Sequence, residues 1–249
     1  MLDFAPMAPV VAMLALAAMV SPRLLGVPDP GIEGSFALAA AVTSILISRG
    51  AAAWLPIGVV AAALAPGLLA WLARRASGWP LWMCGGVVSA VCLLALRGFG
   101  MVYDAPGWSG VDAAVALAAG CVLLVVMSAV WVWLVRGRVG LGIRAVGLGG
   151  DAVRYRIVPA WAARVVVLAA GGVFAGIAGV LFAVAPRGSA ALVPAGAWFT
   201  GMAAAGMGRL VGRFVKASGA VDVVSAVVGS ALWCSLVAAI SAAASAGVF

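Results

Sequence analysis

Long apolar runs, separated by short glycine- and proline-containing segments, dominate this sequence. Hydrophobic residues make up 66% of the chain and charged residues 9%, whereas a soluble domain averages roughly 45–50% apolar and about 25% charged residues. A water-soluble fold of this composition would expose its apolar surplus and aggregate. We therefore expect an all-α, polytopic integral membrane protein that forms a single transmembrane domain over residues 1–249. The apolar runs are 6–22, 36–48, 53–73, 81–96, 111–135, 160–185, 190–208 and 222–247.

The lengths of these runs predict about eight transmembrane helices. A spanning helix needs about 20 residues, with a range of roughly 17–25. Run 36–48 is too short to cross unless it includes Gly31–Ser35, and run 81–96 is marginal. We therefore expect a short or broken second helix, because the backbone groups freed by a break must face a cavity or protein rather than lipid. Tryptophans near run ends, Trp131, Trp133 and Trp161 among them, predict an interfacial belt.

The distribution of basic residues predicts the orientation in the membrane. If loop 136–164 is cytoplasmic, alternation of the runs places 12 of the 15 lysines and arginines on the cytoplasmic side. Only Arg49, Arg97 and Arg187 then lie outside. This predicts a multi-pass protein of a bacterial-type plasma (inner) membrane with both termini outside.

Missing residue types exclude several kinds of chemistry. The chain has no histidine, so histidine-based acid–base catalysis and HExxH zinc sites are excluded. Its one lysine, Lys216, does not stand in a GxxxxGK[ST] phosphate-binding loop, so any ATP must be hydrolysed by a separate subunit. The four cysteines form no CxxC pair and lie in apolar runs. We expect no metal site, no resident cofactor, no nucleic-acid binding and no enzymatic activity in this chain.

Two carboxylates stand at the entrance to the second apolar run. Asp29 and Glu33 belong to the segment Gly26–Phe36, and a carboxylate at the centre of a bilayer costs about 2.5–3.5 kcal/mol on insertion scales. Glu33 could cap the helix that follows, since a negative charge near a helix N-terminus is favoured. Alternatively, the two residues line a translocation pathway or pair with an arginine elsewhere. The candidate pathway residues are Asp29, Glu33, Gly34, Ser35 and Phe36.

The longest loop carries a candidate docking segment, Gly140–Pro159. It opens with several glycines, and Asp151 can cap a short amphipathic helix that runs to about Ile157. Arg154 and Arg156 would project from this helix, which could dock into a groove on a partner protein. The alternative is a solvated loop that follows the positive-inside rule.

A stripe of small residues marks the run 160–185. Gly172 and Gly176 form a GxxxG pattern, and Gly179 extends it. Small residues let two helices approach closely in lipid, where dispersion and backbone contacts replace the hydrophobic effect. We expect tight packing within the helix bundle; a homodimer interface is the alternative.

Three segments in the same order resemble one family. Arg23–Ala40, with Pro28-Asp29 and Glu33-Gly34-Ser35-Phe36, resembles the early-helix motif of ABC-importer permeases of the branched-chain amino-acid type. Its nearest likeness is the subgroup of tryptophan/tyrosine-type uptake permeases. Gly142–Gly147 is similar to the family's Leu-Arg-Ala-x-Gly loop, and Val165–Leu181 to the glycine-rich helix after it. The family's late acidic residue is replaced here by Arg209.

The resemblance implies a permease subunit that takes up an amino acid or similar small solute. Its partners would be cytoplasmic ABC ATPases that bind ATP–Mg, an extracellular solute-binding protein, and a second permease copy or paralogue in the lipid bilayer. The coupling segment would fall on Gly140–Pro159, where Arg144 and Gly147 match the family's loop. Asp151, Arg154 and Arg156 complete the candidate coupling residues. Two other functions are possible from the residues alone: a secondary transporter that binds a coupling ion at Asp29 and Glu33, and a scaffold that transports nothing.

Overall fold

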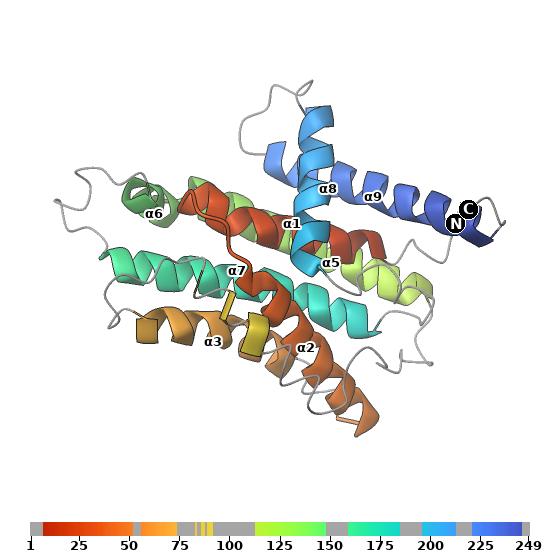
Figure 1. Cartoon of the computed structure of the whole chain (residues 1–249), viewed down its shortest axis with the longest axis horizontal. Helices are drawn as coiled ribbons and strands as arrows, with labels where there is room; N and C mark the ends of the chain where they lie inside the picture. The colour runs from red at the N-terminus through yellow and green to blue at the C-terminus, as the bar shows by residue number, and fades with distance from the viewer. Residues whose placement is uncertain are drawn as a thin grey trace.

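The computed structural model describes residues 7–51, 56–73, 83, 86, 87, 89–91, 113–147, 159–184, 196–212 and 221–245. Most of these residues are helical and none lies in a strand, which confirms the predicted all-helical class. Figure 1 shows the helices labelled along the chain. Their bounds are α1 Met7–Leu24, α2 Gly31–Ser48, α3 Pro56–Ala73, α5 Ala113–Arg136, α6 Arg138–Gly147, α7 Ala160–Val184, α8 Ala197–Gly212 and α9 Val221–Ser245.

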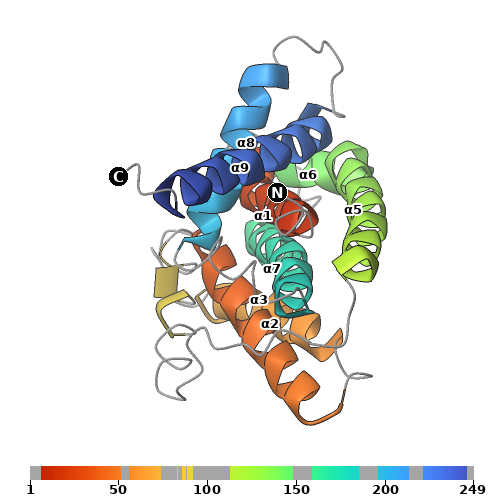
Figure 2. The same ribbon diagram turned by 90° about the vertical axis from the view of Figure 1, so that its right-hand side faces the viewer.

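Helix α1 forms the centre of the bundle. In Figure 2, α1 lies between α5, α7 and the α8–α9 pair, with α2 and α3 beyond α7. Residues Val10–Ala18 have no exposed surface. A helix that is apolar on every side is buried in protein or in lipid, and in α1 small alanines let neighbouring helices enclose it. The first apolar run of the sequence therefore becomes the core of the molecule.

Five of the described helices are long and apolar enough to cross a membrane. The protein is therefore a multi-pass membrane protein, while the expected count of about eight spans stays a prediction. The candidate spans are Met7–Leu24, Gly31–Ser48, Ala114–Arg136, Trp161–Val184 and Val221–Ile240.

The prediction of a short or broken second helix is wrong. α2 includes Gly31–Ser35, which run 36–48 needed in order to be long enough to span. The helix is continuous over 18 residues. The interruption lies before the helix. Pro28 and Pro30 restrict the backbone there, and neither residue can donate an amide hydrogen bond.

The glycines of α7 pack against neighbouring helices of the same chain. A Cβ at Gly172 would overlap the carbonyl oxygen of Ala62 in α3, and one at Gly176 would lie 2.9 Å from the Cβ of Ala62. A Cβ at Gly179 would lie 2.5 Å from the carbonyl oxygen of Phe36 in α2. The α7 stripe therefore holds α2 and α3 close to α7 within one bundle.

Adjacent glycines in α7 give a matched test of this packing. We expect Gly172→Ala to lower the melting temperature of the purified protein, because the added methyl group meets backbone atoms that cannot move away. Gly171→Ala should leave it close to wild type, since its Cβ would meet only side-chain atoms at 3.7 Å and beyond. Thermal unfolding in mild detergent measures both. Equal melting temperatures for the two variants would contradict this account of α7.

One end of the bundle carries most of the described arginines. α1 and α5 end beside α6 at the left of Figure 1, and α7 begins at that same end. Arg49 lies instead at the far end of α2. The grouping agrees with the predicted positive-inside pattern. The arginines at the α6 end are Arg23, Arg136, Arg138, Arg144 and Arg164.

The predicted tryptophan belt is wrong for Trp131. Its side chain has no exposed surface and packs edge-on against Phe174, with the ring centroids 6.0 Å apart. Trp133 and Trp161, by contrast, are exposed. A tryptophan near the end of an apolar run can thus belong to the core when a large partner on the next helix faces it.

Candidate functional site

The segment between α1 and α2 turns the chain back toward the bundle. The hydroxyl of Ser21 donates to the Val27 carbonyl oxygen at 2.7 Å, and the amide of Leu25 donates to the Ser21 carbonyl oxygen at 2.8 Å. Gly26 has a φ of 72°, a conformation that favours glycine. These contacts close the end of α1 and direct Asp29 and Pro30 to the start of α2.

Asp29 caps α2 in this structure. Its Oδ1 accepts a hydrogen bond from the Gly31 amide at 2.8 Å, and the residue is 2% exposed. A Cβ at Gly171 of α7 would lie 3.7 Å from Asp29 Oδ2. The carboxylate thus satisfies one of the free amides of a helix start. Its place is between helices α2 and α7 rather than on an open surface.

Glu33 links the first turn of α2 to the start of α8. Its Oε1 accepts a hydrogen bond from the amide of Gly196 at 3.1 Å, and its side chain is half-buried. Gly196 has a φ of 109°, which only glycine adopts readily. Glu33 therefore neither pairs with an arginine among the described residues nor caps its own helix through its side chain.

Ser89 completes the polar contacts at the start of α2. Its hydroxyl donates to the Pro30 carbonyl oxygen at 2.5 Å and accepts from the Gly34 amide at 3.1 Å. The amide of Glu33 donates to the Pro30 carbonyl oxygen at 3.3 Å. Most amides of this helix start are therefore occupied, so the geometry does not favour an anion here despite the helix dipole.

Ser35 and Phe36 are both buried in the α2 packing. Phe36 packs against Phe182 of α7, with the ring centroids 5.4 Å apart. The hydroxyl of Ser35 is buried and finds no hydrogen-bond partner in the described part of the chain. Ser35 shares a helix face with Ala39 and Thr43, at intervals of four residues. That face carries small residues that pack in the bundle, as Ala39 does beside Gly179.

The described part of the coupling loop contains a helix that the sequence did not predict. α6 covers Arg138–Gly147, so the glycines expected to be loop punctuation are helical. The predicted helix at Asp151–Ile157, with Arg154 and Arg156, lies outside the described residues. Gly140 sits against the Leu134 carbonyl oxygen of α5. Glycine is used at this point to make room for a neighbouring backbone.

Of the two matched coupling residues of α6, Gly147 lies against the end of α1. A Cβ at Gly147 would lie 2.7 Å from the carbonyl oxygen of Leu24 and 2.8 Å from the Cα of Leu25. Arg144 is half-buried, and its Nε finds no partner among the described residues. Val139 and Leu141 of the same helix are exposed. The helix thus combines residues packed on α1 and α5 with exposed apolar side chains.

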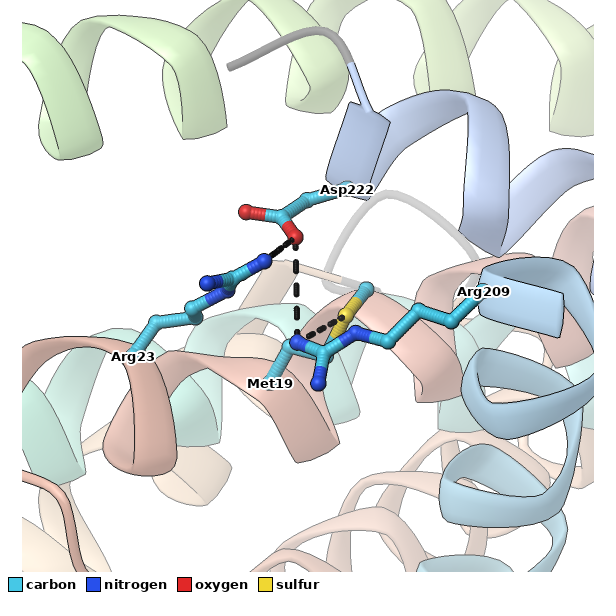
Figure 3. A network of polar contacts seen from close by, with 4 residues as sticks. All are labelled: Met19, Arg23, Arg209 and Asp222. Carbon is cyan, nitrogen blue, oxygen red and sulfur yellow. Dashed lines mark hydrogen bonds and ion pairs between the residues drawn. The ribbon is translucent and has the colours of Figure 1, made fainter. Parts of the chain in front are cut away.

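An ion network that was not predicted from the sequence joins helices α1, α8 and α9 (Figure 3). Asp222 at the start of α9 accepts hydrogen bonds from Nε of Arg23, at 3.0 Å, and from its Nη2. Nη2 of Arg209 lies 3.7 Å from the same oxygen and 3.8 Å from Sδ of Met19. The Asp222 side chain is 6% exposed, whereas the two arginine side chains are 41% and 47% exposed. One buried carboxylate is thus shared by two half-exposed cations.

Comparison with known proteins gives the family. The model of the family described as branched-chain amino acid transport system / permease component matches residues 1–232. The chain belongs to this family. No curated protein sequence matches it. Membership makes the chain a transport permease of the ABC-transporter class, in agreement with its apolar helices. The motifs at Asp29–Phe36 and Gly142–Gly147 lie within the matched range.

Proposed function

We propose that the chain is the membrane-spanning permease subunit of an ATP-binding-cassette importer for a small solute such as an amino acid. ATP would be hydrolysed by a separate cytoplasmic subunit, and an extracellular binding protein would deliver the solute. A second permease chain, either a copy or a paralogue, would complete the pathway. The observation that supports this most strongly is the family match over residues 1–232.

The position of α6 supports a coupling role. A helix that presents exposed Arg138 and Leu141, three residues apart and therefore on one face, at the arginine-rich end offers a surface suited to a partner's groove. Its other face is in backbone contact with α1 and α5 through Gly147 and Gly140. Because these contacts leave no space to compress, a displacement of α6 would pass to the central helix α1.

From α1, the movement would reach the start of α2. The segment after α1 is fixed by Ser21 and is followed directly by Asp29, which caps α2. Glu33, one turn further, contacts Gly196 at the start of α8. In our proposal these residues position the helix starts beside the pathway and undergo no covalent chemistry. Glu33 is the pathway candidate with the more exposed side chain, since Asp29 is enclosed.

The coupling role predicts a defined pull-down result. From native membranes in mild detergent, we expect the tagged chain to co-purify with an ATPase carrying a GxxxxGK[ST] motif, identified by mass spectrometry. The double variant Arg138→Glu, Leu141→Glu should lose it, because both changes fall on exposed positions of α6. Arg49→Glu, an exposed control at the far end of α2, should retain it. If the α6 variant still co-purified with the ATPase, the docking site would lie elsewhere on the chain.

A further inference from the structure

Helices α8 and α9 are joined too closely to move apart. A Cβ at Gly208 would overlap the carbonyl oxygen of Ser225, and one at Gly229 would overlap that of Ala204. Each helix thus contributes a glycine that fits against the other's backbone. Arg209 and Asp222 add an ionic contact within the same pair. Because separation would lose close packing along both helices, α8 and α9 behave as one body.

This pair packs on α1 through both of its helices, and α8 approaches the α1 backbone closely at Gly201. A Cβ at Gly201 of α8 would lie 2.5 Å from the Leu14 carbonyl oxygen and 3.2 Å from the Cβ of Ala18. Leu14 is near the middle of α1, and Figure 1 shows α8 standing across α1 rather than along it. Because the backbones of α8 and α1 approach closely where the two helices cross steeply, this crossing can serve as the pivot, and a small rotation about it would shift α9 along α1.

Polar contacts restrain the pair on either side of this pivot. Gly196, about 7.5 Å before Gly201 at 1.5 Å per residue, donates to Glu33 of α2. On the other side, Asp222 accepts from Arg23 of α1 (Figure 3), close to Arg209, which lies about 12 Å beyond Gly201. Both restraints are individual hydrogen-bonded contacts with a half-exposed partner. Each restraint depends on one half-exposed side chain, Arg23 or Glu33, so we expect it to open before the backbone packing between α8 and α9 does.

We propose that the α8–α9 pair rocks as one body on α1 about the Gly201–Leu14 contact, with the Arg23–Asp222 pair locking one side and the Glu33–Gly196 hydrogen bond the other. The inference rests on the proposed permease function, in which the rocking would carry a movement of α1 to the Glu33 side of the pathway. When the Arg23–Asp222 ion pair breaks, Arg209 remains beside Asp222. The buried carboxylate therefore keeps a cationic partner.

Distances between spin labels test the rocking without any transport assay. The native cysteines are first replaced, and labels are attached through Leu141→Cys on α6 and Leu210→Cys on α8, both exposed positions. In lipid nanodiscs, pulsed electron resonance should give one narrow distance for the parent chain. Arg23→Gln, which removes the lock, should shift part of the population to a second, longer distance. Arg23→Lys, which keeps the charge, should restore the single distance.

A second label pair and a matched control make the test decisive. Labels through Leu210→Cys and Val227→Cys lie on α8 and α9 and should keep one distance in every variant. Glu33→Ala, which removes the acceptor of the Gly196 amide, should also release the pair from its other side, whereas Arg49→Gln should change nothing. An unchanged distribution in Arg23→Gln, or a changed α8–α9 distance, would overturn the proposal. Because ATPase and solute are both absent, failure of the permease function would leave this result unaffected.

Discussion

Replacing Gly208 with valine is expected to abolish recovery of folded protein, whereas the same replacement at Gly206 leaves the yield near wild type. Both glycines lie in α8, so the change in helix propensity is the same. At Gly208 a Cβ would overlap the Ser225 carbonyl oxygen, while at Gly206 nothing lies within 4 Å. Backbone atoms cannot move aside as a side chain can. We therefore expect Gly208→Val to lower the free energy of unfolding by about 3 kcal/mol or more.

Size-exclusion chromatography of fluorescently tagged protein measures this difference directly. Gly208→Val should give aggregate in place of the monodisperse peak, and Gly206→Val should keep that peak. Gly229→Val should fail as Gly208→Val does, because its Cβ would overlap the Ala204 carbonyl oxygen from the opposite helix. A monodisperse peak for Gly208→Val would mean that α8 and α9 pack differently from the arrangement described above.

The helical class and most helix positions follow from the apolar runs. Run 6–22 becomes α1, and run 160–185 becomes α7. These positions could be predicted because a spanning helix needs a minimum apolar length, and charged or proline-rich segments interrupt it. The start of α2 was less certain from the sequence. Five residues with mixed polarity, Gly31–Ser35, join the helix because Asp29 and Ser89 satisfy its free amides.

Pairing between helices could not be read from the sequence. The chain has 33 glycines, and GxxxG spacing alone does not say which carbonyl each glycine meets. Gly172 meets Ala62 of α3, whereas Gly208 meets Ser225 of α9. The role of Asp222 could not be predicted for the same reason, because one carboxylate at the start of an apolar run is typical of an ordinary helix start. Only the three-dimensional arrangement places it between Arg23 and Arg209.

In helix α6, tertiary packing outweighs the low helix propensity of glycine. Gly140 and Gly142 predicted loop, since glycine is unfavourable in a helix interior by about 1 kcal/mol relative to alanine. In the structure, the helix runs through both residues, because Gly140 fits against Leu134 and Ile143 is buried. Tertiary packing therefore decides the conformation at a place where propensity favoured the opposite result.

Uptake by the purified complex is expected to depend wholly on ATP. An importer permease that relies on a separate ATPase has no other energy source, whereas an ion-coupled transporter would use a gradient through Asp29 and Glu33. Asp29 is enclosed and already accepts the Gly31 amide. Glu33 is therefore the side chain to test. Glu33→Gln keeps its size and an oxygen acceptor for the Gly196 amide but removes its charge.

The most direct measurement is uptake of radiolabelled amino acids by proteoliposomes that hold the co-purified complex and its binding protein. We predict uptake that requires ATP on the side of the ATPase, continues when ionophores collapse the proton and sodium gradients, and keeps its ATP dependence in Glu33→Gln. Uptake that follows an ion gradient without ATP, and disappears in Glu33→Gln, would contradict the account and make the chain an ion-coupled transporter.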